Sequence, residues 1–485
     1  MKLKDPSLLK TQLFIDGRWL DADDNATLAV KNPANGKELA KVARGGTAET
    51  RRAVEAADRA WPAWRSKTAK ERAAVLRRWY ELMMANQDDL AQILTAEQGK
   101  PLTEARGEIA YGASFVEWFS EEAKRVYGDT IPGPSKDKRI VTIKQPIGVV
   151  ACITPWNFPN AMLARKIAPA LATGCTVVCK PANATPLSAY AMVALAEKAG
   201  VPAGVINVVT GKTSEIGDEL TGNPTVRKLT FTGSTEVGKQ LIAACSKTVK
   251  RTSMELGGNA PFIVFDDADL DAAVQGAIAS KYRNAGQTCV CTNRFLVQNG
   301  VYDQFSKKLT DAVKKLRVGD GATDGTTLGP LIDANAATNV LEFIDDAVKQ
   351  GAKVVVGGKR AANGDAFVEP TVLSDVTPQM RVFREEIFGP VAPLVRFDTE
   401  DQAIALANAT EVGLASYFYG RDIGRIWRVA EALEYGIVGI NEGLISNEMA
   451  PFGGMKESGN GREGSKYGIE DYLEIKYLCL GGIDR

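Results

Sequence analysis

The sequence predicts an α/β protein in which buried strands alternate with helices. Apolar runs that fit strands are separated by helical stretches from Ile147 onward, and the same alternation returns after Pro261. This pattern is typical of parallel βαβ units whose helices cover both faces of a sheet. The 485 residues are enough for several domains of roughly 150 residues each. We therefore expect two α/β units, preceded by a helical segment.

Composition and charge exclude several classes of protein. Apolar residues make up 45% and charged residues 24%, which is ordinary for globular chains. Basic and acidic residues both total 59, so bulk charge favours neither a nucleic-acid partner nor a membrane partner. No apolar run is long enough to span a bilayer, and the start, MKLKDPSLLK, lacks the apolar core of a secretory signal. The seven thinly spread cysteines fit the reduced thiols of a cytoplasmic protein.

The chain contains no histidine. This excludes a Ser-His-Asp or Cys-His catalytic pair, and it excludes histidine-bearing metal sites. Cysteine-only zinc sites require C-x-x-C pairs, and none is present. We expect no metal site, and any base that serves a cysteine nucleophile must be a carboxylate, a lysine or water.

The first part of the chain predicts a small hairpin and a helical unit. Phe14–Leu20 fits a hairpin with Asp16-Gly17 as its turn. Apolar positions at three- and four-residue spacing predict helices at Ala48–Arg65, Ala69–Thr95 and Glu104–Tyr127. Gly99-Lys100-Pro101 separates the last two. Residues 128–144 contain two prolines and then an alternating apolar run, which indicates a loop and an exposed strand leaving this unit.

Two α/β sets follow, with a boundary expected near Gly257–Gly258. In the first set we predict strands at Ile147–Ile153, Thr176–Cys179, Val205–Val209 and Val226–Phe231, with helices at Pro186–Ala199 and Thr235–Ala244. In the second set we predict strands at Phe262–Phe265, Arg294–Val297 and Lys353–Val356, with helices at Tyr302–Leu316 and Ala336–Gln350.

The stretch KYRNAGQTCVC, residues 281–291, holds the candidate nucleophile. Cys289 and Cys291 stand two residues apart among small and polar residues. Only a thiolate is a strong nucleophile, so a catalytic cysteine needs an approachable, electropositive setting. The Gly-Gln-Thr run before Cys289 suits an irregular loop whose N–H groups can point at an oxyanion. The alternative is that both thiols are small buried hydrophobes.

Two strand ends are candidates for binding a nucleotide. In VRKLTFTGSTEVG, Gly233 allows close backbone approach and Ser234 fits a helix N-cap, where free N–H groups attract phosphate. The alternative is a plain capped turn. Lys180 ends the strand in TVVCKP, at the edge where α/β sheets bind ligands, unless it is a solvated surface lysine. The G-x-G-x-x-G match at 459–464 follows no strand, and we reject it as a dinucleotide fingerprint.

An amide and a carboxylate complete the candidate chemistry. Asn157, in ITPWNFP, can donate to an oxyanion, although it also fits a turn between two prolines. Glu255, in TSMELGGN, stands beside a leucine and two glycines. Apolar surroundings raise the pKa of a carboxyl group and suit it to general-base catalysis. The alternative is an exposed glutamate.

These stretches together resemble the aldehyde dehydrogenase superfamily over nearly the whole chain. The matching motifs, in family order, are ITPWNFP, the KP after TVVC, FTGSTEVG, MELGGN, NAGQTC, EEIFGP and PFGGMKESGNGRE. GINEGLIS and GREGSKYGIEDYLEIKY are most similar to succinate-semialdehyde dehydrogenases of the NADP-using type. The resemblance implies an aldehyde-dehydrogenase-like α/β fold: a Rossmann-type cofactor domain, an α/β catalytic domain and a small oligomerisation arm.

The resemblance also implies how the chain divides. Residues 1–127 and 145–257 would form the dinucleotide-binding domain, and residues 258–440 the catalytic domain with the nucleophilic cysteine. Residues 128–144 and 467–485 would form the oligomerisation arm, which fits the homotetramers and homodimers of the family.

The roles of the site residues follow from the same resemblance. Cys289 would attack the aldehyde carbon, and the Asn157 amide with the Cys289 backbone N–H would hold the oxyanion. Loss of hydride to the nicotinamide leaves a thioester, which water activated by Glu255 would release as the acid. The cofactor contacts implied are Trp156, Asn157, Lys180, Pro181, Ala182, Asn183, Gly233, Ser234, Leu256, Glu386 and Phe388.

Cofactor preference depends on Asn183 in this interpretation. NAD-preferring relatives often have glutamate at this position, which repels the 2′-phosphate of NADP. A neutral asparagine removes the repulsion while Lys180 still attracts the phosphate. The sequence therefore predicts NADP as the cofactor, with NAD as the alternative.

The expected substrate is a small aldehyde with a distal carboxylate. Arg165 and Arg283 match the arginines that bind succinate semialdehyde in the narrower family, and Ser446 matches a third contact. Arginine binds carboxylate bidentately, although each arginine can instead belong to a structural ion pair. Glutarate semialdehyde or another ω-carboxy aldehyde is the alternative substrate.

Two other functional classes, a non-catalytic protein and a cysteine hydrolase, fit the sequence less well. A non-catalytic descendant of the fold would lack the nucleophile or the base, and a cofactor-free cysteine hydrolase would not need Glu386. Cys291 adds a hypothesis of its own. In an irregular loop, residues two apart can come within disulfide reach, so oxidation to a Cys289–Cys291 bond would switch the enzyme off.

Overall fold

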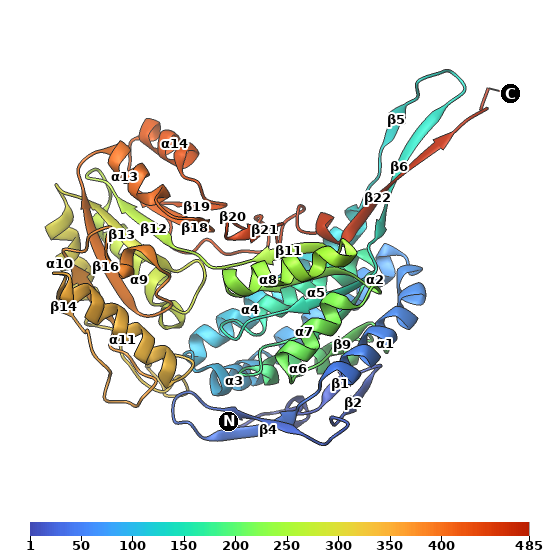
Figure 1. The fold of residues 1–485 in the computed structure, drawn as a ribbon, viewed down its shortest axis with the longest axis horizontal. Helices are drawn as coiled ribbons and strands as arrows, with labels where there is room; N and C mark the ends of the chain where they lie inside the picture. The colour runs from blue at the N-terminus through green and yellow to red at the C-terminus, as the bar shows by residue number, and fades with distance from the viewer. Residues whose placement is uncertain (485) are drawn as a thin grey trace.

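The computed structural model describes residues 1–484, and within them an eight-stranded sheet forms the larger half of the molecule (Figure 1). Its strand order is β2-β1-β9-β8-β7-β10-β11-β21. The strands are β1 (Leu13–Ile15), β2 (Arg18–Leu20), β7 (Val149–Ile153), β8 (Thr176–Lys180), β9 (Ile206–Val208), β10 (Val226–Thr232), β11 (Arg251–Glu255) and β21 (Gly459–Asn460). The five central strands, in the sheet order β9, β8, β7, β10 and β11, are parallel to one another. Antiparallel strands flank them at both edges.

Helices cover both faces of this sheet. They are α1 (Thr47–Arg65), α2 (Ala69–Ala85), α3 (Gln87–Gln98), α4 (Leu102–Glu122), α5 (Ala161–Thr173), α6 (Pro186–Lys198), α7 (Thr213–Gly222) and α8 (Thr235–Cys245). Alternate residues of β7 face opposite sides: Val150 and Cys152 pack with α2 to α6, whereas Val149 and Ala151 pack with α1 and α7. This two-sided burial explains why β7, Val149–Ile153, is apolar throughout.

A seven-stranded sheet with its own core forms the second half of the described chain. Its order is β14-β15-β16-β13-β12-β18-β19. The strands are β12 (Ala260–Val264), β13 (Thr292–Gln298), β14 (Lys353–Val356), β15 (Thr371–Ser374), β16 (Val391–Phe397), β18 (Ala415–Tyr419) and β19 (Ile437–Ile440). The helices are α9 (Leu270–Tyr282), α10 (Tyr302–Val313), α11 (Ala334–Lys349), α12 (Arg381–Arg384), α13 (Glu400–Asn408) and α14 (Ile423–Ala432).

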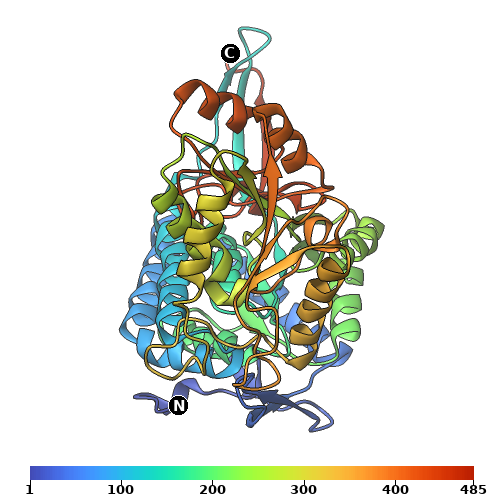
Figure 2. The ribbon, with the colours of Figure 1, turned by 90° about the vertical axis from the view of Figure 1, so that its left-hand side faces the viewer.

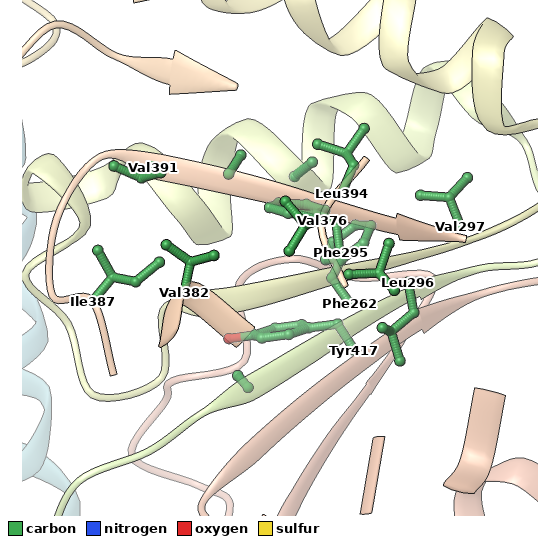
Figure 3. Packing of buried hydrophobic residues seen from close by; sticks show 14 of the residues in the cluster. Phe262, Phe295, Leu296, Val297, Val376, Val382, Ile387, Val391, Leu394 and Tyr417 are labelled. Atoms are coloured by element: carbon green, nitrogen blue, oxygen red, sulfur yellow. The ribbon is translucent and has the colours of Figure 1, made fainter. Parts of the chain in front are cut away.

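Aromatic side chains fill the centre of this second core (Figure 3). Phe262 stacks on Tyr419 with ring centroids 5.0 Å apart, and it contacts the ring of Phe295 at 5.2 Å. Leu394 and Val391 of β16 belong to the same buried cluster. The two large cores therefore form around different sheets, and the chain passes from one sheet to the other between Glu255 and Ala260.

A narrow three-stranded sheet projects from the body with the C-terminal segment along it (Figures 1 and 2). It contains β5 (Thr130–Pro132), β6 (Arg139–Pro146) and β22 (Leu473–Leu480), and β22 pairs with β6 along its whole length. Ile475 and Tyr477 on this arm are exposed. Two small pairs complete the strands: β3 (Thr27–Lys31) with β4 (Glu38–Ala43), and β17 (Val412–Gly413) with β20 (Met455–Lys456). Single-turn 3-10 helices lie at Pro6–Leu8, Ala123–Arg125, Ser246–Thr248, Arg283–Gly286 and Glu470–Tyr472.

The predicted α/β fold class is confirmed, and the differences are local. The helix expected over Ala69–Thr95 is wrong as one element, because it divides at Asn86 into α2 and α3. Asn86 leaves the helical conformation, its side-chain amide donates to the Leu82 carbonyl at 2.8 Å, and its own carbonyl accepts from Leu90 N. Helix α4 ends earlier than expected, at Glu122, before a 3-10 turn.

Several elements were not expected from the sequence. Helix α5 is buried at every position and contains Pro169, a residue that usually ends a helix rather than lying inside one. Strand β11, RTSME, lacks the apolar run that signals a buried strand, and α7 and α9 were also missed. Within residues 1–484, no helix is long and apolar enough to cross a membrane.

Candidate active site

The site forms where parallel strands of the first sheet end side by side. Ile153 of β7 lies opposite both Lys180 of β8 and Phe231 of β10, and Thr232 lies opposite Glu255 of β11. The residues that follow these strands therefore meet at one edge. A cavity of about 280 Å³ opens there, lined by Pro155, Trp156, Asn157, Met162, Thr232, Gly233, Ser234, Glu255, Leu256, Gly257, Cys289, Glu386 and Phe388.

The loop that carries Cys289 comes from the second sheet and is conformationally unusual. Asn284, Ala285 and Gly286 all have positive φ, at 51°, 54° and 77°. Such a backbone is strained for side-chain-bearing residues and persists only when its surroundings hold it. Here Gln98 donates to Asn284 Oδ1 at 2.9 Å, and Glu104 accepts from Asn284 N at 2.8 Å. A Cβ at position 286 would lie 2.2 Å from the Gly389 carbonyl oxygen, so glycine is required there.

Asn157 reaches this loop through its side chain. Its Nδ2 donates to the Gln287 carbonyl at 3.0 Å, while its Oδ1 has no hydrogen-bond partner in the part of the chain that the structure describes. An amide nitrogen carries two hydrogens, so one N–H remains for another acceptor. The backbone carbonyl of Asn157 accepts from Lys100 Nζ at 2.9 Å and from Asn284 Nδ2 at 3.0 Å.

The strand-turn-helix after β10 has the geometry of a phosphate site. Ser234 is the N-cap of α8, where its hydroxyl accepts from Val237 N. A Cβ on Gly233 would lie 2.3 Å from the Phe231 ring, so only glycine fits. Across the cavity, Glu386 accepts from Gly258 N at 3.2 Å, and the Phe388 ring meets Trp156 edge-on at 5.7 Å.

The segment after β8 lies beside the cavity rather than in its wall. Lys180, the last residue of β8, is buried, and within residues 1–484 its Nζ hydrogen-bonds only to the Pro181 carbonyl, at 3.4 Å. Burial lowers the pKa of Lys180 to about 8. Asn183 binds the Gly211 backbone, donating to its carbonyl at 2.7 Å and accepting from its N–H at 3.2 Å. Pro181 is buried and Ala182 is half-buried. A buried ammonium with one weak partner fits a site for ligand hydroxyl or phosphate oxygens.

Arg165, Arg283 and Ser446 are not among the cavity-lining residues. Arg165 on α5 is fully buried, forms an ion pair with Glu463 and lies over the Phe452 ring at 4.3 Å. Among the described residues, its Nη1 and Nη2 atoms have no hydrogen-bond partner. Arg283 is half-buried, 5.3 Å from the Phe158 ring centroid, and has no ion pair within residues 1–484. Ser446 is half-buried in the loop after β19.

Both thiols of the nucleophile loop are free. Cys289 is partly exposed to the cavity, whereas Cys291 is buried and its Sγ donates to the Lys281 carbonyl at 3.4 Å. The two side chains therefore have different environments, although they are separated by one residue.

Comparison with known proteins establishes the family. Residues 19–478 match the model of the aldehyde dehydrogenase family. The chain belongs to that family. It is 65% identical to a 3-sulfolactaldehyde dehydrogenase of Pseudomonas putida, with both chains covered completely. It is 66% identical to a glutarate-semialdehyde dehydrogenase of Pseudomonas aeruginosa, again over both full lengths.

Two further relatives carry the succinate-semialdehyde dehydrogenase name. The NADP(+) enzyme GabD of Escherichia coli is 63% identical, over 99% of this chain and all of that protein. The crystal structure of the enzyme from Burkholderia pseudomallei is 64% identical and superimposes with a TM-score of 0.99, covering 99% of this chain and all of that one. The predicted aldehyde-dehydrogenase-like fold is therefore confirmed.

Burial raises the pKa of three ionisable groups at the aldehyde dehydrogenase cavity. Burial raises the pKa of Cys289 to about 12, with Glu386 and Glu255 adding to it and Arg165 opposing it. Burial and then the Glu463 carboxylate raise the pKa of Glu255 well above its ordinary value. Burial raises the pKa of Glu386 to about 7. At neutral pH, the resting site therefore holds a thiol rather than a thiolate.

Sequence reasoning missed the polar residues that support this site. Lys100 and Glu108 form a buried ion pair at 2.5 Å, and Glu463 pairs with both Arg165 and Lys166. Lys100 was noted only as part of a helix break, and Glu108 lies in an ordinary amphipathic helix. The NAGQTC motif did contain Asn284 and Gln287, but its composition alone does not give their partners.

The raised pKa of Cys289 leads to a testable pH dependence. Without nucleotide, alkylation of Cys289 by iodoacetamide should accelerate about tenfold for each pH unit between pH 7 and pH 10, because the thiolate fraction rises tenfold per unit below the pKa. Peptide-resolved mass spectrometry would measure Cys289 separately from the exposed Cys479. A rate that levels off below pH 8 would contradict the raised pKa.

Proposed function

We propose that this chain oxidises succinate semialdehyde to succinate, with NADP as the expected hydride acceptor and NAD as the alternative. The observation that carries the proposal is one cavity lined by a cysteine thiol, an amide and a buried carboxyl group: Cys289, Asn157 and Glu255. Of the relatives compared, four bear names for dehydrogenases of aldehydes with a distal acid group: succinate and glutarate semialdehydes carry a carboxylate, and sulfolactaldehyde carries a sulfonate.

The chemistry assigns one role to each group. The Cys289 thiol loses its proton to water or to an ionised carboxylate as the sulfur bonds to the aldehyde carbon, and the Asn157 amide with the Cys289 backbone N–H donates to the resulting oxyanion. Once the adduct has lost its hydride, it is a thioester on Cys289. Glu255 takes a proton from the water that attacks the thioester, so the C–S bond breaks and the acid leaves. Its raised pKa makes it a stronger base once it is ionised.

A nicotinamide dinucleotide supplies the hydride acceptor when it is bound. Trp156, Leu256, Phe388 and the Glu386 carboxylate would hold its nicotinamide end, and Gly233 with Ser234 would hold its phosphates. Lys180, with Pro181, Ala182 and Asn183, would surround the adenosine ribose. A neutral Asn183 leaves room for a 2′-phosphate beside a cation, which favours NADP.

The substrate carboxylate would bind to Arg165 and Arg283, with Ser446 as a third contact. Arg283 has no ion pair in the described chain, and two nitrogens of Arg165 lack partners. These unpaired N–H groups support a carboxylate-binding role, since a guanidinium can bind a carboxylate through two parallel hydrogen bonds. Glutarate semialdehyde, one carbon longer, is the second candidate, because a relative of equal identity is named for it.

The remaining assignments concern the whole molecule. We propose the division into a dinucleotide-binding domain (1–127 and 145–257), a catalytic domain (258–440) and an arm (128–144 and 467–485). The exposed apolar side chains on the arm, including Ile475 and Tyr477, fit a homodimer or homotetramer contact. We place the protein in the cytoplasm.

An aldehyde panel tests the function. Succinate semialdehyde should give the highest kcat/KM, with NADP above NAD, because the distal carboxylate and the 2′-phosphate each meet a cation. Absorbance of the reduced nicotinamide measures every combination. Glutarate semialdehyde in first place would support the second candidate, whereas equal rates with butanal would contradict the distal acid class. NAD ahead of NADP would overturn the cofactor assignment.

Replacing the arginines that would bind the substrate carboxylate should change KM more than kcat. Arg283→Ala is expected to raise KM for succinate semialdehyde by about tenfold to a hundredfold, the worth of a charge-assisted hydrogen bond. KM for butanal should change little. Arg165→Ala should act in the same direction, but it also removes one of the two cations paired with the buried Glu463, so Arg283 gives the clearer result.

Arg317→Ala, at an exposed position outside the site, is the matched control. If Arg283→Ala raises KM equally for both aldehydes, the carboxylate-binding role is wrong.

Cys291 tests the redox hypothesis. The parent enzyme should lose activity to peroxide and regain it with dithiothreitol as a Cys289–Cys291 bond forms and is reduced. Cys291→Ala should lose activity without recovery, because its oxidised Cys289 has no neighbouring thiol to protect it. Recovery in Cys291→Ala equal to that of the parent would exclude the switch.

A further inference from the structure

A buried ion pair outside the cavity connects the elements that form the site. Lys100 lies in the connection between α3 and α4, and Glu108 lies in α4. Their side chains are each 1% exposed, with Lys100 Nζ 2.5 Å from Glu108 Oε2. Burying two charges is costly and is offset only when further hydrogen bonds satisfy both groups. The partners of this pair therefore indicate what it holds.

Besides its ion pair with Glu108, Lys100 contacts the loop that carries Asn157. Its Nζ donates to the Asn157 carbonyl at 2.9 Å and lies 3.7 Å from the centroid of the adjacent Phe158 ring. The same carbonyl accepts from Asn284 Nδ2, which also donates to Gln287 O at 3.2 Å. The loop of Asn157 and the loop of Cys289 are thus bonded to each other and to Lys100.

Glu108 holds the other end of the Asn157 loop. Its Oε1 accepts from Asn160 N at 2.9 Å and from Ala161 N at 3.2 Å, at the start of α5. A carboxylate at a helix N-terminus satisfies free N–H groups and favours the positive end of the dipole. Residues 157–161 are therefore held at their first carbonyl by Lys100 and at their last amides by Glu108.

We propose that Lys100 and Glu108 are positioning residues that fix Asn157 in the orientation needed to donate to the oxyanion. This inference rests on the proposed function, in which Asn157 is an oxyanion donor. One N–H of the Asn157 amide is committed to Gln287 O, so the direction of the other depends on where the backbone of residue 157 lies. Without the Lys100 bond, that backbone keeps only the Asn284 donor, and the amide can move away from the reacting oxygen.

A double-mutant cycle tests the proposal. Lys100→Met should slow the burst of reduced nicotinamide by about tenfold or more, since a misplaced catalytic group costs rate steeply. KM for succinate semialdehyde and nucleotide affinity should change less than about twofold, because Lys100 contacts neither. In an Asn157→Ala background, adding Lys100→Met should slow the burst by less than about twofold, because residues that act through one another are not additive.

Lys228→Met is the matched control. Lys228 is also a fully buried lysine of the first half, but it bonds to Ser253 rather than to the Asn157 loop. Whatever rate effect it has should multiply with that of Asn157→Ala. If Lys100→Met does not fold, Lys100→Met/Glu108→Gln removes the unpaired carboxylate charge and carries the same cycle.

The outcomes separate this inference from the proposed function. If Asn157→Ala forms the thioester at the parental rate, the oxyanion role itself is wrong. If Asn157→Ala is slow but the Lys100→Met loss multiplies with it as the Lys228→Met effect does, only the positioning role is overturned. A burst loss that disappears in the Asn157→Ala background supports positioning.

Discussion

The site depends on the shared register of the parallel strands β8, β7, β10 and β11. Because these strands run in the same direction and end together, the residues that follow them emerge at one edge of the sheet. The amide of Asn157, the turn at Gly233 and the carboxyl group of Glu255 come from three different chain segments, yet all three line one cavity. The thiol arrives from the second sheet, so the cavity requires both halves of the molecule.

The net charge of this protein is zero, yet several charged side chains are buried in its interior as ion pairs. Lys100, Arg165 and Lys166 are all buried beside the site, and each has a carboxylate partner, Glu108 or Glu463. Buried charges of this kind contribute little net stability and more to a defined arrangement of the groups they bond. The same low-dielectric surroundings raise the pKa of Cys289, Glu255 and Glu386. The resting site thus holds Cys289 as a neutral thiol, beside a Glu255 carboxyl group whose charged form is disfavoured.

Strain is concentrated in the loop before the nucleophile. Three successive left-handed residues, 284 to 286, turn the chain sharply after α9 and are held by Gln98 and Glu104 from the first half. The end of α3, the start of α4 and Lys100 between them therefore contact both the Asn157 loop and the Cys289 loop. Together they link the two sheets at the point where their reactive groups must meet.

The sequence by itself determined the α/β class, most of the central strands and the motifs that resemble the aldehyde dehydrogenases. These follow from local signals: apolar runs, turn residues, a helix N-cap at Ser234 and the absence of histidine. Local sequence signals also indicated Cys289, Asn157 and Glu255 as candidate catalytic residues, without any information about which residues lie next to them in the fold.

Only the tertiary structure decided which charged residues are buried and which residues they pair with. Lys100 and Glu108, or Arg165 and Glu463, are too far apart along the chain, or too ordinary in their local context, for composition or periodicity to pair them. Helix α5 was missed for another reason, because it contains Pro169, which by itself signals the end of a helix. Such pairings depend on long-range packing, which brings each charge to the one partner that can offset its burial.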